Sequence, residues 1–161
     1  MDVGKVMRTK LILVKPDCPF PEVLRKIASP SPRQAYVVDD DYRLLGVVTA
    51  KDLLKGIMPS YMSADLARSF TDEADFLHRQ INKMKDSRAQ DIMTRKPIYI
   101  QPHHQLLEAD ALIAEHGINT LPVLDAHGKI LGEITRMDII SQLVNNTFGA
   151  HETDLTDVSL L

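Results

Sequence analysis

The chain has 161 residues, of which 44% are hydrophobic and 25% are charged, and its formal net charge is −3 at pH 7. A chain of this length can bury a hydrophobic core, and the composition excludes the disordered, collagen-like and disulfide-rich classes of protein. The 19 basic residues do not outnumber the 22 acidic ones, so a nucleic-acid polymer is excluded as the partner.

The first half of the chain predicts a strand, a helix, two strands that form a hairpin, and a closing helix. These elements are expected at residues 11–14, 21–27, 36–38, 45–48 and 52–57. Short apolar runs with β-branched residues predict the strands, and Pro16 ends the first of them. Pro21 suits the first turn of the helix, whose apolar face comes from Val23, Leu24 and Ile27.

Residues 58–91 are too numerous for a simple connector. Their apolar side chains recur at helical spacing, and Thr71-Asp72-Glu73 is typical of a helix start. The apolar residues are Leu66, Phe70, Phe76, Leu77, Ile81 and Met84. Two interpretations stay open for this insert: an amphipathic helix that covers its own side of the molecule, or a contact within a dimer.

The second half predicts the same order of elements, at residues 98–100, 106–116, 122–124, 131–134 and 138–144. Gly117 is the expected C-terminal cap of the first helix. Residues 6–57 align with 92–143 without a gap and share 13 identities in 52 positions, where unrelated sequences would share about 3. The chain is therefore a duplicated unit, and the tail from Phe148 is expected to be frayed or disordered.

One unit has three strands and two helices, which are too few to bury both faces of its sheet. We therefore expect an α/β (α+β) fold in which two β-α-β-β-α repeats pack sheet to sheet with pseudo-twofold symmetry. The repeats are assigned to residues 6–57 and 92–144, with a helical insert at 58–91 and a tail at 145–161. Together the two repeats form one module.

Each repeat contains a Thr-x-x-Asp motif where its last strand passes into its last helix, at Thr49 to Asp52 and at Thr135 to Asp138. The structural interpretation is a capping box, in which threonine and aspartate satisfy backbone amides of the first helical turn. The functional interpretation is a phosphate site at the helix N-terminus, with the carboxylate accepting hydrogen bonds from a ribose diol. Two copies in symmetric positions favour the functional interpretation.

The two repeats resemble a tandem pair of CBS domains, the small modules named after cystathionine β-synthase. The resemblance covers about residues 6–57 and 92–144 and depends on ordered features of both units, whereas the insert and the tail lie outside it. It implies that adenosine derivatives such as AMP, ADP, ATP or S-adenosylmethionine bind in clefts between the repeats. It also implies that the module regulates a partner or an attached enzyme.

The resemblance implies two clefts, each combining the motif of one repeat with the first strand and the start of the hairpin in the other. In the first cleft, Thr49 and Asp52 would contact phosphate or ribose, and Lys51 would be a further cation. The other repeat would supply Thr94, Pro97 and Ile98 around the base and Asn119 and Thr120 near the phosphate. The second takes Thr135, Arg136 and Asp138, with Leu11 and Ile12 at the base, and Arg33 and Gln34 near the phosphate. Two arginines favour a charged nucleotide in the second cleft.

Two departures from the family pattern leave the ligand preference of the second cleft open. The first repeat has Ser-Pro-Ser-Pro at 29–32 where the second has residues 115–118, and Tyr36 stands where the family usually has a proline, as at Pro122. A simpler interpretation of Arg33, as an exposed loop arginine, also stays open.

A catalytic site cannot be assembled from these residues, because a nucleophile, a base and a group that stabilises an anion do not occur together. Cys18 has no evident neighbouring base and is interpreted as an incidental thiol. His103 and His104 are interpreted as loop histidines, and Asp39–Asp41 as a solvated turn, so neither predicts a metal site. The single cysteine and the absence of an apolar leader or a long apolar run indicate a cytoplasmic protein without membrane insertion.

We therefore expect a non-enzymatic sensor of AMP, ADP or ATP that needs no cofactor or metal. It would work as a homodimer stacked through the short helices, and its target would be an enzyme or a transporter. One alternative is a ligand-free module for dimerisation or protein interaction, in which Asp52 and Asp138 act only as caps. Another is an S-adenosylmethionine binder, in which Arg33 and Arg136 are unimportant.

Overall fold

The first half of the chain forms a sheet with helices on one side. Its elements are η1 (Val3–Lys5), β1 (Ile12–Val14), α1 (Phe20–Ile27), β2 (Ala35–Val38), β3 (Leu44–Val48) and α2 (Ala50–Ile57). β1 pairs in parallel with β2, and β2 pairs antiparallel with β3, with a bulge between Val37 and Val38. The structure, a computed structural model, describes residues 1–28, 34–150 and 155–160.

The insert folds into separate helices. They are α3 (Ala64–Arg68), α4 (Glu73–Lys83) and, directly before the second repeat, α5 (Ala89–Ile92). Asp72 caps α4 by accepting a hydrogen bond from the Asp75 amide at 3.0 Å, which confirms the predicted helix start. Leu77, Ile81 and Met84 pack against the core of the first unit, so α4 covers its own side of the molecule.

The second half repeats the arrangement with a smaller sheet. The elements of this half are β4 (Thr94–Arg95), α6 (Leu106–His116), β5 (Thr120–Leu124), β6 (Ile130–Thr135), α7 (Arg136–Phe148) and, in the tail, η2 (Val158–Leu160). β4 does not join the smaller sheet but pairs antiparallel with β3, as the fourth strand of the first sheet. β5 and β6 pair antiparallel. As predicted, Gly117 caps α6, with the left-handed φ of 60° that glycine adopts without strain. α7 continues to Phe148, beyond its predicted end at Val144.

The strand predicted at 98–100 is reduced to a single bridge. Only Ile100 pairs, in parallel with Val123: its amide donates to the Pro122 carbonyl at 3.0 Å, and its carbonyl accepts from the Leu124 amide at 2.9 Å. Just before it, the positive φ of 51° at Lys96 interrupts the extended backbone, and a proline follows that has no amide to donate. The equivalent segment of the first repeat lacks this proline and forms β1.

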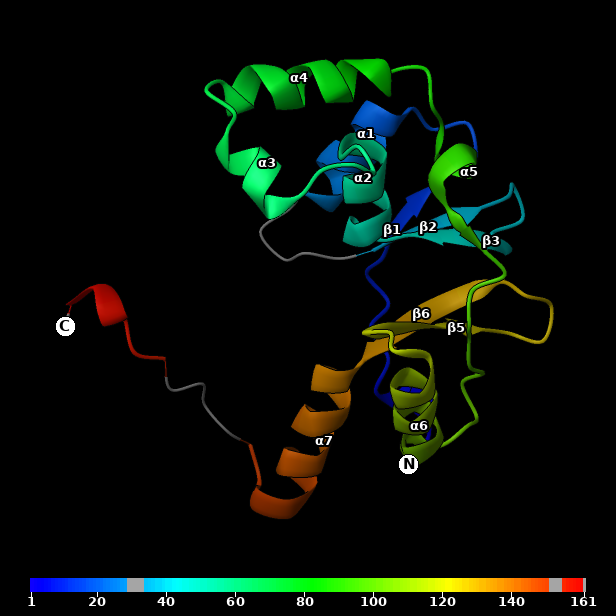
Figure 1. The fold of residues 1–161 in the computed structure, drawn as a ribbon. Helices are drawn as coiled ribbons and strands as arrows, with labels where there is room; N and C mark the ends of the chain where they lie inside the picture. Colours follow the sequence, from blue (N-terminus) through cyan, green and yellow to red (C-terminus); the bar gives the residue numbers. More distant parts are fainter. Residues whose placement is uncertain (29–33, 151–154, 161) are drawn as a thin grey trace.

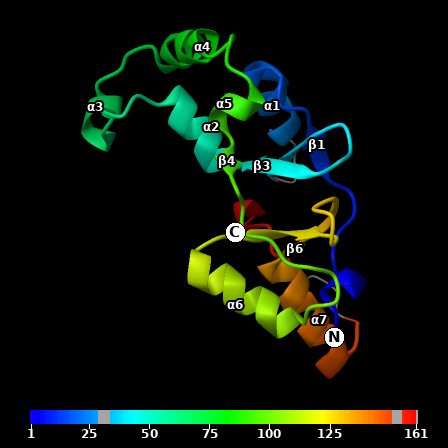
Figure 2. The same cartoon turned by 90° about the vertical axis from the view of Figure 1, so that its right-hand side faces the viewer.

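The two units face each other through their sheets and carry their helices on the outer faces (Figure 1). Figure 2 shows α1 and α2 on the far side of the first sheet and α6 and α7 on the far side of the second. The predicted α/β pair of repeats packed sheet to sheet is confirmed. The N-terminal segment begins beside α6 and then crosses to the first unit to form β1.

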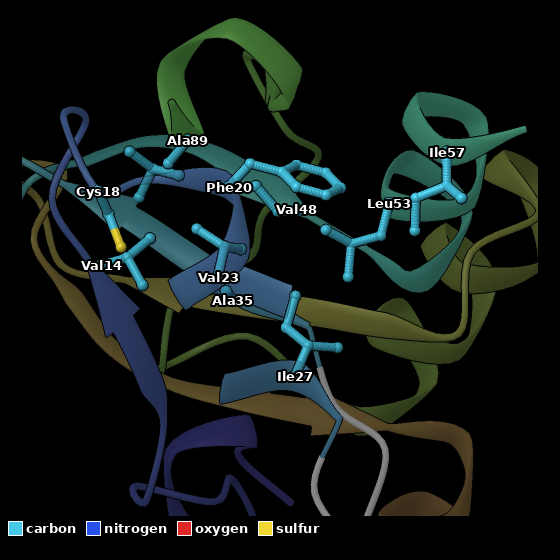
Figure 3. Packing of buried hydrophobic residues seen from close by; sticks show 11 residues of the cluster. Val14, Cys18, Phe20, Val23, Ile27, Ala35, Val48, Leu53, Ile57 and Ala89 are labelled. Atoms are coloured by element: carbon cyan, nitrogen blue, oxygen red, sulfur yellow. The ribbon is translucent and has the colours of Figure 1, made fainter. Parts of the chain in front are cut away.

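The leading segments of the repeats exchange places between the two cores. In the first unit, Ala89 is fully buried beside Phe20 and Val23, although it precedes the second repeat (Figure 3). In the second unit, Val3 is fully buried with Ile113, although it precedes the first repeat. Each core is therefore completed by the chain that leads into the other repeat.

Two glycines allow these leading segments to approach the sheets. A Cβ atom on Gly46 of β3 would lie 2.5 Å from the Met93 sulfur and 2.9 Å from the Thr94 carbonyl oxygen. A Cβ atom on Gly132 of β6 would lie 2.6 Å from the Arg8 carbonyl oxygen. Both positions are too close for a side chain, so the duplicated glycine is required by the duplicated crossing.

Candidate functional site

The two Thr-x-x-Asp motifs form complete capping boxes. Thr49 and Thr135 are extended N-caps, and their hydroxyl oxygens accept from the amides of Asp52 at 3.3 Å and Asp138 at 3.2 Å. In return, Oδ2 of each aspartate accepts from the amide of its threonine at 2.9 Å. The structural interpretation of the motif is confirmed, and α2 and α7 start two residues before the predicted positions because the threonines are the caps. Only Oδ1 of each aspartate lies outside this arrangement.

The Oδ1 atoms of the two aspartates have different neighbours. Asp52 Oδ1 accepts a long hydrogen bond from the Thr94 hydroxyl at 3.4 Å. Asp138 Oδ1 accepts a short bond from Nε of Arg8 at 2.7 Å. Thr94 and Arg8 each belong to the first residues of the repeat that does not contain the aspartate they contact. Both are nevertheless paired with the sheet that carries this aspartate's motif. Thr94 pairs with Val47, and Arg8 bridges to Glu133.

The structure distributes the predicted base and phosphate residues differently from the sequence-based assignment. Ile12 pairs with Ala35, which in turn pairs with Val48 next to Thr49, so Ile12 belongs to the unit of the first motif. Leu11 precedes it directly, and Gln34 directly precedes β2 in the same unit. Arg33 lies outside the described residues.

The corresponding residues of the second repeat lie with the second motif. Thr120 is directly opposite Thr135 in the β5–β6 ladder, and Asn119 precedes it. Ile98 packs against the core of the second unit, and Pro97 is its neighbour in the chain. Of the residues assigned to the first cleft, the structure therefore brings Thr94 alone from the second repeat to Asp52.

The reason for this regrouping is the crossing of the chain. Between Arg8 and Ile12 the chain passes from the second unit to the first, and between Thr94 and Ile98 it passes the other way. One neighbour of each motif therefore comes from the segment that precedes a crossing, Thr94 for the first motif and Arg8 for the second. The other residues predicted for the base and the phosphate come from the motif's own repeat. Arg8 was not predicted as a site residue, although it stands 86 positions before Thr94, the constant offset of the repeats.

Positive charge is available at both helix starts. Lys51 lies exposed in the first turn of α2, and Arg136 is the exposed first residue of α7. Helix N-termini carry free amides and a partial positive charge, which attract anions. Each motif therefore presents a carboxylate oxygen, a helix N-terminus and a cation close together.

A buried hydrogen-bond chain joins the two units. The fully buried Tyr36 of β2 donates its hydroxyl proton to Glu133 Oε2 of β6 at 2.5 Å, and Gln34 Nε2 donates to the Tyr36 oxygen at 3.0 Å. Burial, and then the charge of Glu133, raise the pKa of Tyr36 well above its usual range, so this tyrosine stays a neutral donor. The acidic Glu133 in an otherwise apolar strand was the sequence signal for this contact.

The other polar residues singled out from the sequence have structural roles. Cys18 is buried in the core of the first unit, and burial raises the pKa of its thiol. Asp39 accepts from the amides of Asp41 and Arg43, both at 2.9 Å, as expected for a turn, and these bonds lower its pKa. His104 contacts the Glu108 carboxylate at 2.9 Å.

Neither a metal site nor a membrane span is found in the described part of the chain. Residues 1–28, 34–150 and 155–160 contain no group of three or more histidine, cysteine, aspartate or glutamate side chains placed to hold a metal ion. Within the same ranges, every helix is too short or too polar to cross a bilayer.

Comparison with known proteins identifies relatives over most of the chain. A family model described as CBS domain matches residues 3–59 and 89–145. The uncharacterized protein MJ1426 of Methanocaldococcus jannaschii is 27% identical over 158 residues, which cover 88% of this chain and 94% of that protein. The CBS domain-containing protein CBSX2 of Arabidopsis thaliana is 30% identical over 146 residues, which cover 86% of this chain but only 61% of CBSX2.

Solved structures show the same fold. The crystal structure of CBSX2 in complex with AMP has a TM-score of 0.69 and 28% identity, and the match covers 90% of this chain and 97% of the crystallised chain. The CBS domain pair of protein MJ0100, crystallised with 5′-methylthioadenosine and S-adenosyl-L-methionine, has a TM-score of 0.66 and 17% identity over 91% of this chain and 97% of the other. The second likeness is one of fold alone.

Proposed function

Because this chain belongs to the CBS domain family, we propose that it is a regulatory sensor that binds AMP, ADP or ATP between its two units. The observation that carries this proposal is the likeness to the CBSX2 chain crystallised with AMP, which covers nearly all of both chains. The duplicated motif supports it, because each copy offers a carboxylate oxygen beside a helix N-terminus.

The proposed contacts follow from the geometry of the motifs. Oδ1 of Asp52 or Asp138 accepts the ribose hydroxyls, since Oδ2 is already engaged by the capping threonine. The amides at the start of α2 or α7 receive the phosphate, with Lys51 or Arg136 supplying positive charge. The base lies against the apolar residues at the start of each unit.

The residues for the base and those near the phosphate follow the regrouping of the chain. Leu11, Ile12 and Gln34 are proposed for the cleft of Thr49 and Asp52, together with Thr94. Pro97, Ile98, Asn119 and Thr120 are proposed for the cleft of Thr135 and Asp138. Apart from Thr94, the residues proposed for each cleft come from the repeat that carries its motif, and we propose that a nucleotide bound there also reaches the facing sheet of the other unit.

A nucleotide that contacts both units can act as a signal. Binding changes the balance between two arrangements of the units if the ligand binds one arrangement more tightly than the other. The target that reads this change is proposed to be an enzyme or a transporter acting in trans. We propose that the chain itself is not an enzyme. We also propose that it is located in the cytoplasm, although the CBSX2 relative is named as chloroplastic.

The module is proposed to work as a homodimer. α7 exposes Met137, Ile140 and Leu143 by 59%, 49% and 58%, and α2 exposes Leu54 by 56%. A row of apolar side chains on a short helix is an unusual surface for a monomer and favours a contact with the same helix of a second copy.

Thermal unfolding with added nucleotides tests the proposed function. At a hundredfold excess over Kd, a specific ligand adds roughly 2.7 kcal/mol to the free energy of unfolding. The ligands are AMP, ADP, ATP and S-adenosylmethionine, with GTP as the control. They are added to wild type, Asp52→Asn and Asp138→Asn, and the melting temperature of each protein is compared with that of the same protein without ligand. Asparagine still accepts the capping hydrogen bond, so these variants test the carboxylate and keep the helix cap.

An adenosine-selective rise in melting temperature that one of the two substitutions abolishes is the expected result. No rise with any ligand, in protein shown to be free of copurified nucleotide, would refute nucleotide sensing and favour the ligand-free interaction module. A rise with S-adenosylmethionine alone would replace the nucleotide by that ligand.

A further inference from the structure

We propose that only the cleft built on Asp52 is open to a nucleotide, because Arg8 occupies the ribose-binding oxygen of Asp138. This inference rests on the proposed function and departs from the sequence-based preference for the cleft of Arg136. It makes Arg8 the residue that decides how many ligands the chain binds.

The Arg8 side chain is held in place on Asp138. Nε of Arg8 donates to Asp138 Oδ1 at 2.7 Å, which is a short, charge-assisted bond. Arg8 is also fixed through its backbone, because its amide donates to the Glu133 carbonyl at 2.8 Å and its carbonyl accepts from the Glu133 amide at 2.9 Å. With Arg8 in this position, the Asp138 side chain is only 10% exposed.

Asp52 has no such occupant at the same position. Its Oδ1 receives only a bond of 3.4 Å from the neutral Thr94 hydroxyl, among the contacts of the described residues. A ribose hydroxyl can replace this long bond with a shorter one of the same kind. At Asp138 it would have to displace a guanidinium and separate an ion pair whose carboxylate is only 10% exposed, although the arginine is 43% exposed.

One pair of equivalent residues carries the difference. Arg8 and Thr94 are 86 positions apart, as are Thr49 and Thr135, and both donate to Oδ1 of an aspartate. The surrounding capping boxes match to within 0.1 Å in their printed distances. Exchanging these two residues should therefore exchange the properties of the two clefts.

Isothermal titration calorimetry with AMP on the full chain tests the inference. Wild type is expected to bind one AMP per chain, and Arg8→Thr is expected to bind two. Thr94→Arg is expected to weaken AMP binding at least tenfold. The double variant Arg8→Thr/Thr94→Arg is expected to bind one AMP, now at the Asp138 cleft.

Added aspartate substitutions locate the ligand. Asp52→Asn should abolish binding in wild type, and Asp138→Asn should abolish it in the double variant. Arg25→Thr, on the exposed face of α1, is the matched control for the loss of an arginine and should bind one AMP. Circular dichroism confirms that each variant is folded, and Arg8→Ala replaces Arg8→Thr if the latter does not fold.

The possible failures are distinguishable. A wild-type chain that binds none of AMP, ADP and ATP refutes the proposed function, and the inference with it. Two AMP per wild-type chain, or a single AMP that Asp138→Asn abolishes and Asp52→Asn does not, refutes the inference alone. Loss of binding in Arg8→Thr would overturn it as well, because Arg8 would then be a ligand-binding residue.

Discussion

Replacing Tyr36 by phenylalanine should weaken the contact between the two units in a way that depends on pH. The substitution removes a fully buried hydroxyl that donates to Glu133 at 2.5 Å and accepts from Gln34 at 3.0 Å. A hydrogen bond to a charged group contributes about 1.5–3 kcal/mol. We therefore expect Tyr36→Phe to lower the free energy of unfolding by about 2 kcal/mol at pH 7.

The pH dependence follows from the direction of the pKa shift. The native pKa of Tyr36 is raised above the ordinary tyrosine value of about 10, so above that pH the unfolded chain releases a proton that the native chain keeps. The stability contributed by Tyr36 is thus fully present below about pH 10 and is lost as the pH rises further. Linkage gives a loss of about 1.4 kcal/mol between pH 9 and pH 11.

Urea unfolding of wild type and Tyr36→Phe at pH 7, 9, 10 and 11 measures this loss, because the other titrating groups cancel in the difference. The difference in free energy of unfolding should fall from about 2 kcal/mol at pH 7 to about 0.6 kcal/mol at pH 11. Tyr99→Phe is the matched control, since its ring is half exposed, and it should change stability by less than about 0.5 kcal/mol. A difference that stays constant with pH would refute a buried, neutral Tyr36.

Three further predictions concern packing, capping and assembly. Ile113→Ala, which truncates a fully buried side chain, should lower the free energy of unfolding by about 2–5 kcal/mol in urea titrations, whereas Leu107→Ala, at a 78% exposed position, should not change it measurably. Thr135→Ala removes the side-chain cap of α7 and should lower it by about 1 kcal/mol by the same assay; an unchanged midpoint would mean that another group caps the helix. Ile140→Glu should convert a dimer into a monomer in analytical ultracentrifugation, and a sedimentation coefficient unchanged from wild type would place the contact elsewhere.

The sequence predicted the local elements well because their signals are local. The constant offset identified the duplication, the threonine and aspartate of each motif predicted the caps, and Gly117 predicted the end of α6. The predicted strand at 98–100 failed because two adjacent residues, Lys96 and Pro97, disturb the backbone before it.

The assignment of residues to clefts was harder because it depends on where the chain crosses. A run such as Arg8 to Ile12 looks continuous in the sequence, but its ends lie on different units. Periodicity and propensity describe which face of an element is buried and do not describe which sheet a segment joins. For the same reason Arg8 was missed, although its equivalence to Thr94 was present in the alignment of the repeats.

The exchange of leading segments has consequences for cutting the chain into two fragments and for its origin from a single repeat. A fragment that ended before Ala89 would lack the residue that fills the core beside Phe20, and the remaining fragment would lack Val3. Two fragments cut within the insert should therefore reassemble when mixed, each supplying the missing piece of the other. A single-repeat ancestor could have completed its core in the same manner, as a dimer in which the two copies exchanged their first residues.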